Sequence, residues 1–176
     1  MRAGMTGFFR PSQARRLARA ALCSVLLVCA ACAGPGARDP AALANAYLEA
    51  GRTNEAAREI ELAVRTRPED PALRLEAARI LARADKLDRA IEHLEAALQM
   101  APADAEISIQ LGTLEQRRGN LPDAYVAFRR AAELAPNDIR AVSGLALAAE
   151  GLGFESEAND AYARWAELER ELGIEN

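Results

Sequence analysis

The stretch that defines the architecture is residues 102–138, which read PADAEISIQLGTLEQRRGNLPDAYVAFRRAAELAPND. It opens on Pro102-x-Asp104 and closes on Pro136-x-Asp138, so the same pair of residues returns after 34 positions. Gly119-Asn120 divides the stretch into two segments whose apolar residues recur at helical spacing. The pattern predicts a helix, a tight turn and a second helix, ended by a proline.

The interval of 34 residues extends in both directions along the chain. Small residues, large apolar residues and turn residues each keep this spacing. With only 8 prolines and 11 glycines in the chain, so many coincidences do not arise by chance. The positions that share the interval are Pro68, Pro102 and Pro136; Asp70, Asp104 and Asp138; Ala56, Ala90, Ala124 and Ala158; Ala63, Ala97 and Ala131; Ile60, Leu94, Phe128 and Tyr162; and Gly51, Asp85, Gly119 and Gly153.

Each repeating unit is predicted to contain two helices. Asp39-Pro40 and Asp70-Pro71 place a capping oxygen before a proline whose missing N–H costs nothing in the first turn of a helix. The first helix of a unit should run about 14 residues to the turn. The residues expected near the starts of the second helices, as side-chain caps or as a tolerated proline, are Asn54, Asp88, Pro122 and Ser156.

The pattern resembles the tetratricopeptide repeat (TPR) family, with its motif W-x2-L-G-x2-Y…A-x3-F…P. Leu111-Gly112, Ala124-x3-Phe128 and Pro136 make residues 105–138 the closest match. Leu43-Ala44-x2-Tyr47 makes residues 37–70 a good match. No unit has the early tryptophan, and the last unit lacks the terminal proline. The resemblance implies an all-α fold, a right-handed α-solenoid of four units (37–70, 71–104, 105–138 and 139–172) followed by a tail (173–176).

The last unit departs from the others at Trp165, which stands where they have alanine. Since no fifth unit follows, the indole is predicted to cover the end of the stack, beneath a helix that is acidic outside. An alternative is that Trp165 and Phe154 form a patch for self-association.

Composition narrows the classes of protein further. Aromatic residues are only 5% and apolar residues 51%, which favours a helical domain over a sandwich or barrel. All 26 acidic residues follow Arg38, together with 16 of the 22 basic ones. So acidic a body argues against a nucleic-acid partner. All three cysteines lie in the first 32 residues, so the repeats can form neither a disulfide nor a thiolate metal site.

The N-terminal region has the order of a secretory signal. Residues 2–19 carry arginines and no acid, and the small and apolar run Ala20 to Ala33 follows, interrupted only by Ser24. This run is too short for a membrane-spanning helix, which needs roughly 20 residues. We therefore expect residues 1–31 to be a cleaved signal peptide.

Two cleavage sites fit this region. Val28-Cys29-Ala30-Ala31-Cys32 resembles a bacterial lipobox, although Cys29 replaces the usual leucine. The resemblance implies a lipid on Cys32 and, with Ala33 next, an outer-membrane protein facing the periplasm on a linker (32–38). Cleavage after Ala33 would instead remove every cysteine and leave a soluble periplasmic protein.

No catalytic or metal-binding constellation is predicted. His93 is the only histidine, so neither a Ser-His-Asp arrangement nor a histidine metal cluster can form. Gly151-Leu-Gly153 lacks the preceding strand of a phosphate loop. We expect a protein that is not an enzyme, with no cofactor and no small-molecule substrate.

The TPR resemblance implies a concave groove lined by the first helices, which binds a protein or peptide. Its arginines predict a basic stripe that holds an acidic segment or a C-terminal carboxylate, with apolar side chains as anchors. Alternatively, these arginines only pair with neighbouring glutamates. The predicted groove residues are Asn45, Leu75, Arg79, Arg83, Ile109, Gln110, Thr113, Arg117, Arg140 and Leu147.

Together these features are similar to the pilotin-like TPR lipoproteins of type IV and Tad pilus assembly. They imply a non-catalytic scaffold at the outer membrane, in the assembly of a pilus, a secretin or another envelope complex. Two alternatives stay open. One is a soluble periplasmic scaffold for envelope enzymes or cytochrome maturation, and the other is a structural subunit of an envelope biosynthetic enzyme complex.

Overall fold

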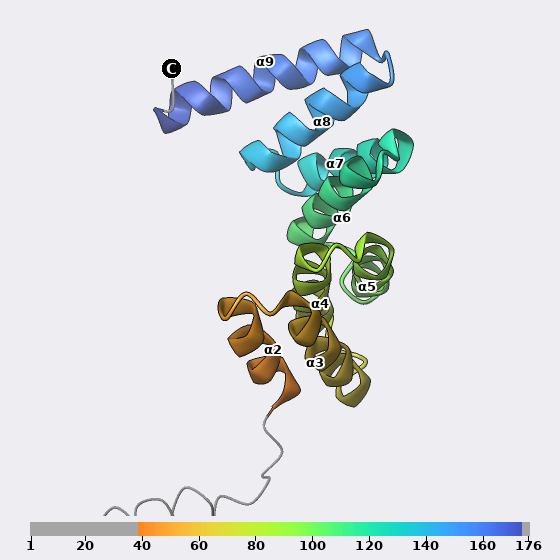
Figure 1. Cartoon of the computed structure of the whole chain (residues 1–176). Helices are drawn as coiled ribbons and strands as arrows, with labels where there is room; N and C mark the ends of the chain where they lie inside the picture. Colours follow the sequence, from red (N-terminus) through yellow and green to blue (C-terminus); the bar gives the residue numbers. More distant parts are fainter. Residues whose placement is uncertain (1–38, 174–176) are drawn as a thin grey trace, which may run out of the picture. The chain divides into compact units, whose positions relative to one another are not determined.

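The structure is a computed structural model that describes residues 39–173. Every regular element in this part of the chain is an α-helix (Figure 1). The helices are α2 (Pro40–Glu49), α3 (Thr53–Thr66), α4 (Pro71–Arg83), α5 (Leu87–Met100), α6 (Ala105–Arg118), α7 (Leu121–Leu134), α8 (Ile139–Gly151) and α9 (Glu155–Leu172). The predicted all-α fold is confirmed for these residues. Within them, no helix combines the length and apolar character needed to cross a bilayer.

The predicted N-terminal features lie outside the described residues. They are the signal peptide (1–31), the lipidated Cys32 and the linker (32–38), and residues 174–176 of the tail are outside as well. Each of the four predicted 34-residue units contains one pair of helices.

An aspartate caps the first helix of each pair. The Asp70 carboxylate accepts a hydrogen bond from the backbone N–H of Leu73 at 3.0 Å, which satisfies an amide that has no partner inside the helix. Asp39, Asp104 and Asp138 do the same for α2, α6 and α8. The predicted helix starts at Asp39-Pro40 and Asp70-Pro71 are confirmed.

The turn inside each pair requires a left-handed backbone. Gly51, Gly119 and Gly153 have φ of +72°, +84° and +77° there, a conformation that a Cβ disfavours. The next N–H then bonds back to the carbonyl five residues earlier, as from Asn120 to Glu115 at 2.9 Å. Asp85, with φ of +58°, holds the equivalent place in the second pair.

The predicted side-chain caps of the second helices are wrong. Asn54, Asp88 and Ser156 are each the second residue of their helix, past the position from which a side chain caps the first turn. The residues at the capping position make no side-chain capping bond. The backbone bonds of the left-handed turn set these helix starts instead. Pro122, also a second helical residue, is tolerated as predicted.

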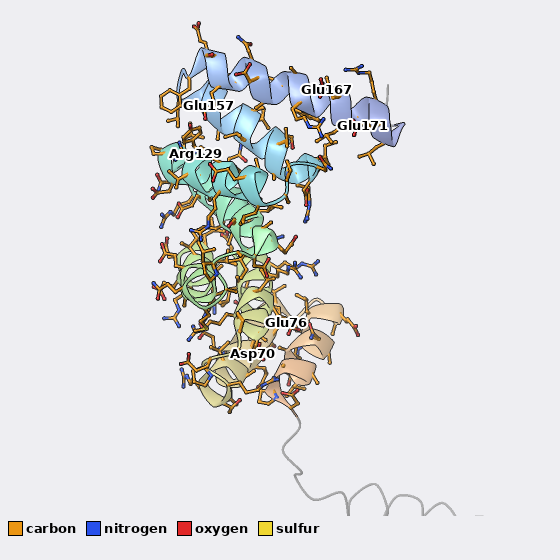
Figure 2. All side chains as sticks on the ribbon, turned by 180° about the vertical axis from the view of Figure 1, so that it is seen from behind. Asp70, Glu76, Arg129, Glu157, Glu167 and Glu171 are labelled. Carbon is orange, nitrogen blue, oxygen red and sulfur yellow. The ribbon has the colours of Figure 1, made fainter. Side chains whose placement is uncertain are left out.

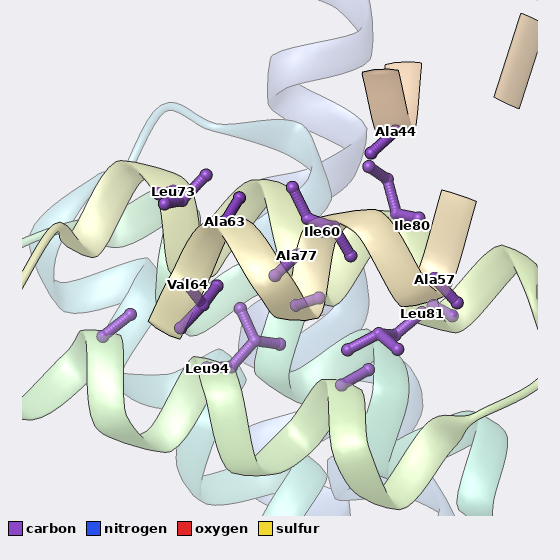
Figure 3. Close-up of a cluster of buried hydrophobic side chains, with 14 of the residues drawn as sticks. Ala44, Ala57, Ile60, Ala63, Val64, Leu73, Ala77, Ile80, Leu81 and Leu94 are labelled. Carbon is purple, nitrogen blue, oxygen red and sulfur yellow. The ribbon is translucent and has the colours of Figure 1, made fainter. Parts of the chain in front are cut away.

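Alanines allow the helices to approach closely. The repeated alanines of the second helices in the first three pairs, such as Ala63 and Ala97, have no exposed surface. The large residues of the same repeat, Ile60 and Leu94, are fully buried beside them. Figure 3 shows Ile60, Ala63 and Leu94 in one apolar cluster with side chains of α4. Close backbones therefore alternate with large side chains that fill the remaining space.

Consecutive helices pack against each other along the chain (Figure 1). In addition α2 contacts α4, and α6 contacts α8, so first helices of neighbouring pairs adjoin. These contacts place the first helices next to one another, which is the arrangement that a groove between them requires.

The last helix, α9, has a charged outer surface. Asp160, Glu167 and Glu171 are exposed, and Figure 2 labels the two glutamates on this helix. Trp165 is half-buried and stacks on Tyr162, with 5.9 Å between the ring centroids. A polar outer surface suits a helix at the end of a stack.

Candidate partner-binding groove

The first helices of three neighbouring pairs, α2, α4 and α6, line a hollow of about 470 Å³. It brings together six of the predicted groove residues, which are Asn45, Arg79, Arg83, Gln110, Thr113 and Arg117. Leu48, Glu76, Ile80, Ala82 and Leu114 complete its lining. Leu75, Ile109, Arg140 and Leu147 lie outside the lining.

A carboxylate on α6, that of Glu106, joins three helices at the edge of this hollow. It accepts hydrogen bonds from Arg79 of α4 at 2.6 Å, from Gln110 at 2.9 Å and from Arg140 of α8 at 2.8 Å. Burial raises the pKa of Glu106, but the hydrogen bonds from Arg140, Gln110 and Arg79 outweigh it and lower the pKa. Hydrogen bonds to Asp138 and Glu106 raise the pKa of Arg140. The whole cluster therefore stays ionised at neutral pH.

The Glu106 cluster corrects the predicted basic stripe. Arg79 and Arg140 share Glu106, and Arg140 also pairs with Asp138 at 2.7 Å, so neither presents an uncompensated charge. For these two arginines the alternative of pairing with neighbouring acids holds. Within residues 39–173, Arg83 and Arg117 make no ion pair.

The two remaining arginines lie at the same end of the hollow. Arg83 is the last residue of α4, and Arg117 is the last but one of α6. Arg117 donates one hydrogen bond to the carbonyl oxygen of Ala82 at 3.3 Å, which places its guanidinium across the gap between the helices. The positive charge of the groove is thus concentrated at the C-terminal ends of α4 and α6.

The predicted apolar anchors also need correction. Ile109 is only 3% exposed and packs with Ala131 and Ala141, so it lies in the core and cannot contact a partner. Leu75 is half-buried against the main core cluster. Leu147 is 42% exposed on α8, outside the hollow.

Sequence reasoning missed two residues that form the apolar floor. Ile80 and Leu114 line the hollow although they are only 1% and 4% exposed. They lie 34 residues apart, at one position of successive units, directly after Arg79 and Thr113. This shared position was the signal that could have identified them. With half-buried Leu48, they provide apolar surface below the arginines.

No group of three histidine, cysteine or acidic side chains in residues 39–173 is arranged to hold a metal ion. The acidic residues of α9 lie in surface ion pairs, where Arg164 contacts Glu167 at 3.0 Å and Glu171 at 3.9 Å. His93 lies outside the lining of the groove.

Comparison with known proteins agrees with this geometry. Residues 81–149, which include α5 to α8 almost completely, match the tetratricopeptide repeat family model. The fold is that of TPR proteins. No sequence among the curated proteins matches this chain.

Solved TPR structures extend the likeness beyond the matched segment. A crystal structure of MamA is 22% identical, over 77% of this chain and 80% of MamA, with a TM-score of 0.70. The first TPR of Spaghetti (RPAP3), bound to the HSP90 peptide SRMEEVD, is 21% identical over 65% of this chain and 90% of its own, with a TM-score of 0.60. At this level of identity the likeness describes the fold alone.

Proposed function

We propose that this chain is a non-catalytic scaffold that binds a protein partner in the hollow along α2, α4 and α6. The TPR fold is consistent with a role in protein–protein interaction. The observation that supports the proposal is the pair of arginines without ion-pair partners, Arg83 and Arg117, above an apolar floor. A site of this kind needs neither a cofactor nor a small-molecule substrate.

The chemistry of the hollow favours an acidic segment or a carboxylate as the bound group. Arginine binds carboxylates through paired charge-assisted hydrogen bonds, and Arg83 has its donors available. Apolar side chains of the partner would contact Leu48, Ile80 and Leu114. The HSP90 peptide bound by the RPAP3 domain, SRMEEVD, is itself acidic at its end.

Reversing the charge of these arginines should abolish most of the binding. In Arg83→Glu with Arg117→Glu, we expect the affinity for the partner to fall at least about tenfold, since two hydrogen bonds to charged groups are lost. The measurement is capture of envelope proteins from a detergent extract by the purified chain, identified and quantified by mass spectrometry. Circular dichroism should show unchanged helix content.

A matched control uses two exposed arginines of α3, Arg58 and Arg65, which make no ion pair in the described residues. Arg58→Glu with Arg65→Glu changes the net charge equally but leaves the hollow intact. Equal loss of partners in both double variants would indicate a general charge effect, and unchanged capture by the groove variant would exclude this site.

We further propose that a lipid on Cys32 holds the protein at the outer membrane, facing the periplasm. The support is the sequence Val28-Cys29-Ala30-Ala31-Cys32 after an apolar run. The process served by the scaffold would be the assembly of a pilus, a secretin or another envelope complex. The partners identified by capture would name that process.

Cys32→Ser should release the protein from the membrane fraction and remove the mass of the lipid. Cys29→Ser is the matched control, because it alters a cysteine three residues earlier and should leave both properties unchanged. The measurements are intact mass and partition between membrane and soluble fractions. A Cys32→Ser protein that keeps the wild-type mass and partition would favour the soluble periplasmic alternative.

A further inference from the structure

A buried histidine lies where the first and second helix pairs meet. His93 of α5 is only 7% exposed. Its Nδ1 is 3.4 Å from a guanidinium nitrogen of Arg74 on α4, and its Nε2 is 3.5 Å from a carboxylate oxygen of Glu61 on α3. Arg89, one turn earlier on α5, donates to both oxygens of Glu61. Each of the three helices thus places a charged side chain against the imidazole.

The geometry determines the protonation state. A guanidinium can only donate hydrogen bonds, so Nδ1 must accept from Arg74. The proton of neutral His93 is therefore on Nε2, which faces Glu61 but makes no hydrogen bond in the described residues. The cluster is built for a neutral imidazole.

Arg74 connects this imidazole to the link between the pairs. Its Nε donates to the carbonyl oxygen of Pro68 at 2.8 Å. Pro68 lies between α3 and α4, two residues before the Asp70 that caps α4. The position of the Arg74 side chain is therefore coupled both to His93 and to the backbone of the link.

A second proton on His93 breaks this arrangement. It adds a donor at Nδ1, 3.4 Å from the donor of Arg74, and a positive charge close to both Arg74 and Arg89. Glu61 offers the only opposing charge, and its two oxygens already accept from Arg89. An imidazolium would have to push Arg74 away from Pro68 or leave its buried position.

We infer that His93 is an acid-sensitive element that loosens the junction of the first two helix pairs as the pH falls. Burial lowers the pKa of His93 below 6.5, and this effect exceeds the raising effect of Glu61. The unfolded chain therefore takes up the proton first. Stability is greatest above about pH 6.5 and decreases as the pH falls toward the lower pKa of the folded state.

The first test uses the fact that the chain has one histidine. NMR of the full chain without a histidine tag should show a single imidazole that titrates with a midpoint below 6.5. Below pH 7 the neutral form should carry its proton on Nε2. A midpoint at or above 6.5, or a proton on Nδ1, would overturn the inference.

The second test locates the effect by hydrogen exchange at about pH 7.5 and pH 5.0, corrected for intrinsic rates. Protection of α3 and α4 amides should fall three- to tenfold at the lower pH, since one pKa unit corresponds to about tenfold. Amides of α8 and α9 are the internal control and should not change. In His93→Gln, whose amide oxygen can accept from Arg74, the fall in α3 and α4 should disappear. An equal fall in all four helices, or the same fall in His93→Gln, would contradict the inference.

The consequence for binding rests on the proposed function. Asn45 of α2 donates to Glu76 of α4 across the groove, so a looser junction moves one wall of the hollow. Because both tests omit a partner, they can succeed or fail independently of the proposed binding site.

Discussion

Phe128→Ala should lower the free energy of unfolding by about 3–5 kcal/mol, the usual cost of removing a buried aromatic ring. Phe128 of α7 is 3% exposed, and its ring lies against two glycines, Gly112 of α6 and Gly144 of α8. One side chain therefore joins the third helix pair to the fourth. Chemical denaturation followed by circular dichroism measures the change.

Val126→Ala is the control on the same helix. Val126 is 55% exposed, so its truncation should cost less than about 0.5 kcal/mol. The assignment of Phe128 as the central packing residue fails if the two substitutions cost the same.

The glycines around Phe128 give a reciprocal test. A Cβ on Gly112 would lie 2.9 Å from the ring, and one on Gly144 would overlap it more strongly. Alanine in a helix normally stabilises relative to glycine by about 1 kcal/mol, but Gly144→Ala should destabilise by about 1–3 kcal/mol. Combining it with Phe128→Leu should cost less than the sum of the two changes, since the smaller side chain makes room for the methyl group.

Arg118→Ala should lower the free energy of unfolding by about 3 kcal/mol or more, the typical cost of leaving a buried charge without its partner. Glu115 of α6 is only 2% exposed. Arg118 donates to both of its carboxylate oxygens, at 2.9 Å and 2.7 Å, and reaches Asp88 of α5 at 3.5 Å. Without the guanidinium the carboxylate stays buried beside a second acid.

Arg129→Ala is the matched control for this pair. Arg129 faces Glu133 at 4.0 Å, and both side chains are at least half exposed, so the change should be below about 1 kcal/mol. Equal costs for Arg118→Ala and Arg129→Ala would show that the Glu115 pair is not a buried ion pair in solution.

Replacing both partners separates the pair from the buried charge alone. Glu115→Leu with Arg118→Met removes the charge together with its partner, and buried pairs replaced in this way often lose little stability. We therefore expect the double variant to be more stable than Arg118→Ala.

Much of the fold could be predicted because its signals are local. Aspartate before the first helix of a pair, glycine at the turn and alanine at the crossings act within a few residues, and they recur every 34 positions. The starts of the second helices were wrong for a related reason. Asn54, Asp88 and Ser156 are typical capping residues, but the hydrogen bonds of the left-handed turn begin each helix one or two residues earlier.

The candidate site was only partly predictable. Position within the unit brought Arg79, Arg83 and Arg117 to one surface, and the structure places all three on the hollow. The same rule misplaced Ile109, because the packing of α6 against the next pair turns this side chain into the core.

By itself, the sequence determined that the described chain is a series of helix pairs and which helices carry the groove. Those properties depend on backbone preferences and on a regular spacing of small and large side chains. Only the tertiary structure decided which charges remain available. Arg79 and Arg140 meet Glu106 from positions 27 and 34 residues away, while Arg83 meets no acid in the described residues. Ion pairing acts over a few ångströms in space, and neither composition nor spacing along the chain reports that distance.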